Sequence, residues 1–160
     1  MGLVLVLVDA FFVGYDAVPD VLGWVLVCVG VHALRHRLAG SDTLLGVAAL
    51  AGVISAVLFW PSVDEAISES GGWILSVPQL VFCVILCGSV ADLADADNPS
   101  RAARFRTLRW VFVALAVAPV LLYGGGLTVL RTPIAVVAVV ANVYLVYLLF
   151  MVSKKTYALP

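Results

Sequence analysis

Residues 132–153 read TPIAVVAVVANVYLVYLLFMVS, and residues 70–91 read SGGWILSVPQLVFCVILCGSVA; neither stretch contains a charged side chain. Each is long enough, as a helix, to cross the roughly 30 Å hydrocarbon core of a bilayer. In lipid every backbone N–H and C=O must be bonded within the segment, so even the valine-rich run 136–143 is expected to be helical. Strands of a membrane barrel would alternate apolar and polar residues, and these runs do not.

The same pattern along the chain predicts an all-α fold, a polytopic transmembrane helix bundle that forms one domain over residues 1–160. The expected helical segments are residues 2–15, 19–37, 43–60, 72–92, 105–123 and 132–153. All but the first are expected to be full spans. Residues 2–15 are apolar except for Asp9 and reach only about 22 Å as a helix, so they either make a short crossing or re-enter the bilayer.

The composition is that of a membrane protein. Hydrophobic residues make up 64% of the chain and charged residues 12%, too few to cover a globule in water. The net charge of -1 argues against nucleic acid as a partner, because that would need a basic surface. The sequence has no P-loop, dinucleotide fingerprint or nucleophile–base motif, so we expect no enzyme, no catalytic residue and no cofactor. Cys28, Cys83 and Cys87 lie in apolar runs and are expected to be packing residues.

The basic residues are unevenly distributed. All of the nine Lys and Arg except Arg131 fall into three groups: Arg35 with Arg37, Arg101 with Arg104, Arg106 and Arg109, and Lys154 with Lys155. By the positive-inside rule these groups face the cytoplasm, which predicts a multi-pass protein of the cell membrane with a cytoplasmic C-terminus. If residues 2–15 cross, there are six spans with both ends inside, which we favour. If they re-enter, there are five spans and the N-terminus is outside.

Residues 16–24 carry a short motif. Asp16, Pro19, Asp20, Gly23 and Trp24 match a D-x-x-P-D-x-x-G-[WY] pattern. This segment resembles one near the N-terminus of uncharacterised small multi-pass bacterial membrane proteins, which implies a similar entry of the chain into the membrane and no activity. The simpler interpretation is a turn followed by a helix start, since proline presets the first helical φ. The alternative is that Asp16 and Asp20 form an outward-facing carboxylate pair that binds a cation.

Asp9 is an acidic residue well inside an apolar run, where a carboxylate is costly unless it has a partner. Counting 1.5 Å per residue from an expected turn after Tyr15 places Trp24 and Gln79 at the same depth. We therefore expect Asp9 to accept a hydrogen bond from Trp24 or Gln79 in a buried polar layer. The other members of this layer are Ser76, Ser55 and Asn142. The layer either holds the helices together or forms a shallow outward-facing site where Asp9 takes a proton or a cation.

His32 and His36 lie one helical turn apart, a spacing that can hold a metal ion. No third ligand is evident in the sequence. Contact with lipid headgroups is therefore the simpler interpretation, and we expect no metal site.

A loop that carries both charges, expected on the cytoplasmic side, separates the segments expected at 72–92 and 105–123. Three aspartates are followed by four arginines, Arg101, Arg104, Arg106 and Arg109. We expect them to form internal salt bridges and to bind anionic lipid headgroups; docking of a cytoplasmic partner is the alternative. Asn98 followed by Pro99 predicts a helix that starts just before the arginines.

Two classes of function remain. The first is a non-enzymatic membrane subunit or scaffold that binds other membrane proteins or a second copy, which is suggested by the small size, short loops and small-residue faces such as Ala48 and Gly52. The second is a small transporter or permeation protein with an outward-facing polar site around Asp9. A partner that copurifies in mild detergent would favour the first, and solute flux through the purified protein would favour the second.

Overall fold

The computed structural model describes residues 20–58, 69–95, 97–125 and 128–156. All regular elements in these ranges are helices: α2 (Asp20–Ala33), α3 (Ser41–Leu58), α5 (Glu69–Asp95), α6 (Pro99–Gly124), the short 3-10 helix η1 (Thr128–Leu130) and α7 (Arg131–Thr156). The predicted all-α class is therefore confirmed for this part of the chain. Residues 2–15, with Asp9, lie outside the described residues.

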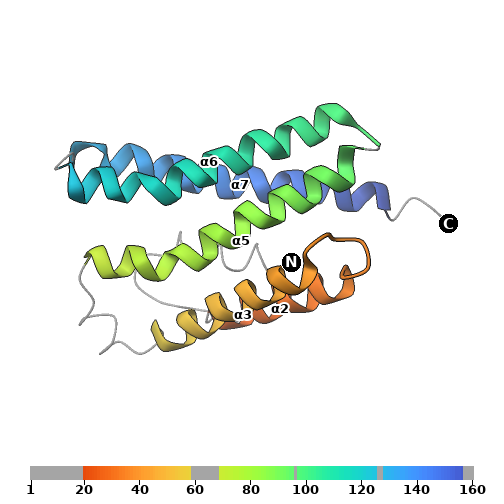
Figure 1. Cartoon of the computed structure of the whole chain (residues 1–160), viewed down its shortest axis with the longest axis horizontal. Coiled ribbons are helices and arrows are strands. Elements are labelled where there is room, and N and C mark those ends of the chain that lie inside the picture. Colours follow the sequence, from red (N-terminus) through yellow and green to blue (C-terminus); the bar gives the residue numbers. More distant parts are fainter. Residues whose placement is uncertain (1–19, 59–68, 96, 126–127, 157–160) are drawn as a thin grey trace.

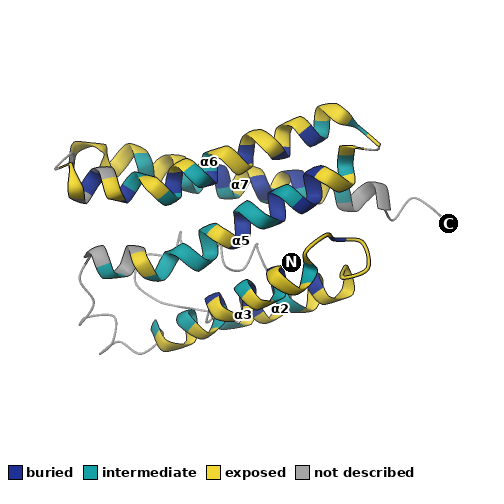
Figure 2. Ribbon diagram, viewed as in Figure 1, coloured by how far each residue is buried: buried dark blue, intermediate teal, exposed yellow. Residues whose placement is uncertain are grey.

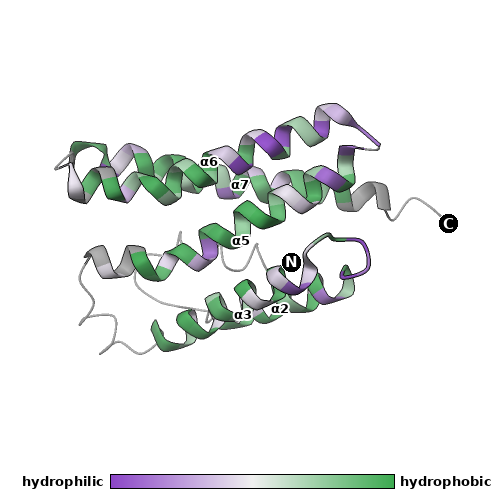
Figure 3. Ribbon diagram, viewed as in Figure 1, coloured by the Kyte–Doolittle hydropathy of each residue, from purple (hydrophilic) through white to green (hydrophobic). Residues whose placement is uncertain are grey.

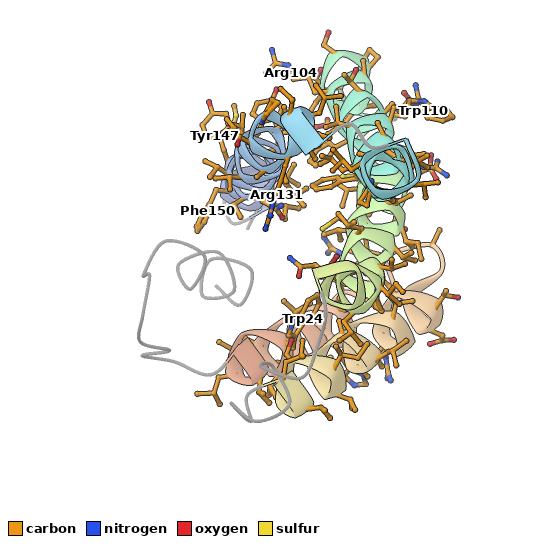
Figure 4. The ribbon with its side chains drawn as sticks, turned by 90° about the vertical axis from the view of Figure 1, so that its left-hand side faces the viewer. Trp24, Arg104, Trp110, Arg131, Tyr147 and Phe150 are labelled. Carbon is orange, nitrogen blue, oxygen red and sulfur yellow. The ribbon has the colours of Figure 1, made fainter. Side chains whose placement is uncertain are left out.

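The helices lie side by side along the long axis of the molecule (Figure 1). The α2–α3 hairpin forms one side, α5 runs through the middle, and α6 and α7 form the other side. Among the described elements, α2 packs on α3, α3 on α5, α5 on α6, and α6 on α7. Viewed end-on, the helices form an open arc with α2 and α7 at its two ends (Figure 4).

Three of the described helical stretches are long and apolar enough to cross a membrane: Ser41–Leu58, Ile74–Asp95 and Arg131–Val152. The apolar part of α2, Val21–Ala33, is shorter, and α2 ends at Ala33 rather than at the expected residue 37, because residues 34–37 form a turn. The first half of α6 carries the four arginines, which leaves residues 110–124 as its uncharged part. The sequence predicts five full spans, and three of them correspond to described helices that are long and apolar enough to cross.

The start of α6 follows from its capping residue. The backbone N–H of Arg101 donates a hydrogen bond to Asn98 Oδ1 at 3.2 Å, which satisfies one of the free donors of the first turn. Pro99 occupies the first helical position, where its missing N–H costs nothing. The capping role predicted for Asn98 and Pro99 is confirmed. The expected start at residue 105 is wrong, because the arginine-rich run forms the first turns of α6 rather than a loop.

The core is built along α5 and α6 and extends to the neighbouring helices. Figure 2 shows buried residues concentrated where these helices face one another. The largest fully buried side chains are Phe82, Phe105, Phe112, Leu44, Leu145, Leu148, Cys83 and Cys87. The prediction that Cys83 and Cys87 are packing residues is confirmed, since both are free and buried.

Trp24 joins the α2–α3 hairpin to α5. Its side chain is only 2% exposed, and its ring lies edge-on to Phe82 of α5 with centroids 5.5 Å apart. On α3, a Cβ added at Gly52 would lie 3.1 Å from the Trp24 Cβ, so α3 approaches this closely because Gly52 has no side chain. Ala48 is also buried in the core. The small residues Ala48 and Gly52, which the sequence suggested as a surface for a partner, are therefore used inside the chain.

Replacing Gly52 with Leu should destabilise the protein. The new side chain would meet Trp24, and overpacking of this kind typically costs about 1–3 kcal/mol. Gly46→Leu is the matched control, because it lies on the same helix and a Cβ there would meet nothing within 4 Å. Both variants gain the same helix propensity, so the difference isolates the contact. Thermal unfolding in detergent should show a lower midpoint for Gly52→Leu alone; equal midpoints would contradict the packing described.

Candidate functional site

Most of the charged residues in the described part of the chain gather at one end of the helix bundle, and Arg131 is an exception at the other end. The α2–α3 turn with Arg35 and Arg37, the α5–α6 turn and the C-terminal end of α7 lie at the same end (Figure 1). Lys154 and Lys155 belong to the last turns of α7. Figure 3 shows the hydrophilic residues of both turns at this end and a mostly apolar middle. We call it the basic end; it is the most distinctive charged feature of the described residues.

A hydrogen bond fixes the α2–α3 turn against α5. The hydroxyl of Ser89 donates to the backbone carbonyl of Ala39 at 2.8 Å, and Ser89 itself is buried. The next residue, Gly40, has a φ of 71°, a left-handed conformation that glycine adopts without strain. Its carbonyl accepts from the N–H of Leu44 at 3.0 Å, in the first turn of α3. The sequence analysis missed Ser89, whose only signal was a hydroxyl in an apolar helix close to a charged turn.

The arginines of α6 differ in their surroundings. Arg106 Nη2 lies 2.9 Å from Asp95 Oδ2, which links the start of α6 to the end of α5. Both side chains are about half exposed, so this pair contributes at most about 1 kcal/mol. Arg104 is exposed and points away from the bundle (Figure 4). The expected internal salt bridge thus forms for Arg106, while Arg104 presents its charge to the surroundings.

Arg109 lies deeper along α6 and packs across α5. A Cβ added at Gly88 would lie 3.4 Å from Arg109 Nη1, so the guanidinium rests where Gly88 has no side chain. The neighbouring Trp110 is exposed and points outward from α6 (Figure 4). Tryptophan and arginine are typical of the membrane–water boundary. This pair therefore marks where the apolar part of α6 begins.

The described residues of the predicted polar layer lie in two separate parts of the arc and do not form one layer. Trp24 packs on Phe82, and Gln79 lies one turn before Phe82 on α5, where it is half-buried. Ser76 of α5 and Ser55 of α3 are half-buried on the same side of the molecule. These residues belong to the α2, α3 and α5 part of the arc.

Asn142 belongs to α7, at the other end of the arc. Its amide nitrogen donates to the carbonyl of Ala138 at 2.9 Å, within its own helix. Asp9 and Asp16 lie outside the described residues. Asp20 is the first residue of α2, and Gly23 and Trp24 lie in the same helix. These three residues are the part of the predicted motif that the structure describes.

His32 lies at the end of α2 and His36 in the turn that follows. Both are exposed, and Arg35 Nε donates to His36 Nε2 at 3.2 Å. Within the described ranges no three His, Cys, Asp or Glu side chains are grouped so that they could hold a metal ion. The two histidines belong to the basic end.

No family model, curated protein or solved structure matches the chain. Its class is therefore defined by the described helices themselves. In the described ranges they form an all-α bundle with three helices long and apolar enough to cross a membrane, and most of the charged residues lie at one end of it.

Proposed function

We propose that this chain is a non-enzymatic membrane subunit or scaffold that crosses the bilayer several times with its basic end in the cytoplasm. The observation that carries the orientation is the gathering of three basic groups, distant in sequence, at one end of the bundle. The positive-inside rule places each of the three basic groups on the cytoplasmic side. The C-terminal end of α7 is therefore cytoplasmic in this proposal.

The proposal includes crossings by α2 and α6. Each lies alongside a helix able to span, α2 against α3 and α6 against α5. At α6 the apolar residues 110–124 start at the boundary marked by Arg109 and Trp110. At α2 the turn that follows the helix carries Arg35 and Arg37, whose long side chains can reach the headgroups. With residues 2–15 as a further span, both ends of the chain lie in the cytoplasm.

A subunit role fits the surface of α7. Among the described elements this helix packs only against α6 and η1, and many of its large apolar side chains are exposed. A peripheral span with so much open surface can accept another membrane protein or lipid. The exposed charges of the basic end, next to α7, would lie at the depth of the lipid headgroups.

Thiol labelling tests the orientation. In a variant whose native cysteines are replaced by alanine, Val129→Cys places a thiol in η1, at the end opposite the basic one, and Ser100→Cys places one in the first turn of α6. Both residues are exposed. A membrane-impermeant reagent added to intact cells should label Val129→Cys only, because the basic end is inside. Labelling of Ser100→Cys alone would show that the protein has the opposite orientation.

Anionic lipid is the proposed partner of the basic end. A basic residue near a charged surface contributes about 1 kcal/mol, but Asp95 offsets the charge of Arg106. Arg104→Gln should therefore reduce the anionic lipid retained in native mass spectra more than Arg106→Gln does. Added salt should mimic the loss, since the attraction is screened. Equal retention by both variants and the unchanged protein would reject this role.

Purification in mild detergent and reconstitution test the subunit role itself. We expect a stoichiometric membrane-protein partner, either another protein or a second copy, and no solute flux when the chain alone is placed in liposomes. The transporter alternative makes the opposite prediction. A flux through the purified protein that Asp9→Asn abolishes with folding intact would contradict the subunit proposal and assign function to Asp9.

A further inference from the structure

Arg109 is held against α5, yet within the described residues it makes no hydrogen bond or ion pair. A Cβ added at Gly88 would lie 3.4 Å from Arg109 Nη1, 3.7 Å from Cζ and 3.9 Å from Cδ, so the end of the side chain runs along the α5 backbone. Arg106, one turn earlier on α6, is instead paired with Asp95 at 2.9 Å. Arg109 is exposed, and its N–H donors are therefore open to a ligand.

The depth of Arg109 is that of the lipid phosphates in the proposed orientation. Gly88, which it contacts, lies seven residues before Asp95 at the end of α5, or about 10 Å at 1.5 Å per residue. Trp110, the next residue of α6, is 71% exposed and points outward (Figure 4). The part of α6 that follows is uncharged. Arg109 therefore lies where the headgroup layer meets the hydrocarbon core.

The acidic residue one turn from Gly88 does not neutralise Arg109. Asp92 lies four residues further along α5, towards its end, and is exposed. It forms no ion pair with Arg109, whose guanidinium lies at the level of Gly88. An arginine at the edge of hydrocarbon is costly without an anion. The planar fork of its N–H groups matches two oxygens of a phosphate.

The surface that continues from Arg109 into the membrane is apolar on both helices. On α6 the same side carries Val113 and Ala116, four and seven residues further on. On α5 the side of Gly88 carries Val84 and Val81, four and seven residues back. All four residues are at least partly exposed. An acyl chain can therefore lie along α5 and α6 while its phosphate is at Arg109.

We propose that Arg109 binds the phosphate of one anionic phospholipid of the cytoplasmic leaflet, whose acyl chain lies along α5 and α6. The proposal rests on the proposed orientation and adds one tightly held lipid to the headgroups attracted by Arg104. The other basic residues of this end repel the positive group of a zwitterionic lipid, which selects an anionic one. Because α5 covers part of the guanidinium, salt screens this contact less than it screens that of Arg104.

Native mass spectrometry tests the site in the full chain, extracted in mild detergent from liposomes of phosphatidylglycerol and phosphatidylcholine. One phosphatidylglycerol per chain should remain at a salt concentration that removes the other lipids. Arg109→Gln should weaken its binding about tenfold, the effect of one charged hydrogen bond, with an unchanged unfolding temperature in lipid-free detergent. Arg109→Lys should restore only part of the binding, because an ammonium lacks the fork. Arg104→Gln is the matched control and should keep the lipid. Its retention by Arg109→Gln, or equal loss from both Gln variants, overturns the proposal.

Three other outcomes also overturn the site but leave the subunit role standing. Equal retention of phosphatidylcholine excludes an anionic lipid as the ligand. Displacement of the lipid by inorganic phosphate, but not by chloride at equal ionic strength, shows a site for a free anion. Retention of the lipid only after Asp92→Asn shows that Asp92 neutralises Arg109 in the unchanged protein. Labelling of Ser100→Cys alone from outside the cell would instead place Arg109 in the outer leaflet and overturn the orientation together with this site.

Discussion

In the membrane setting that we propose, backbone hydrogen bonding in hydrocarbon is the constraint on which the rest of this structure depends. Each N–H and C=O of an apolar segment must be paired inside that segment, so a valine-rich run such as 136–143 becomes part of α7 rather than a strand. Asn142, a polar side chain inside α7, meets the same requirement by donating to the Ala138 carbonyl of its own helix. Ser89 donates to the Ala39 carbonyl and so joins α5 to the α2–α3 turn.

Helix α5 holds the two sides of the arc together because it packs against both α3 and α6. Lipid tails are as apolar as the side chains, so the hydrophobic effect does not drive helices together here, and close packing must do so. Two of the contacts between helices occur where a glycine leaves room. Gly52 receives Trp24 at one contact, and Gly88 receives the guanidinium of Arg109 at another.

The features that could be predicted from the sequence are local ones. The helical class follows from the uncharged runs, the start of α6 from Asn98 and Pro99, and the packing role of Cys83 and Cys87 from their apolar surroundings. The order of the helices in the arc could not be predicted, because helices that are apolar all round carry no stripe to show which face is inside. Ala48 and Gly52 were misassigned to an outer face for that reason. The bond from Ser89 to Ala39 joins residues far apart in sequence, so no local pattern reveals it.

The central claim is that the long apolar helices cross the bilayer rather than lie on it, and a depth profile along α7 tests it most directly. Spin labels placed one at a time along its exposed side, from Arg131 through Val140 to Phe150, report immersion through their relative access to oxygen and to a polar nickel reagent. A crossing helix predicts that immersion rises to a maximum near Val140 and falls towards both ends, since each turn changes the depth by about 5.4 Å. Constant immersion from end to end would show a helix that lies in the membrane surface and would contradict the account.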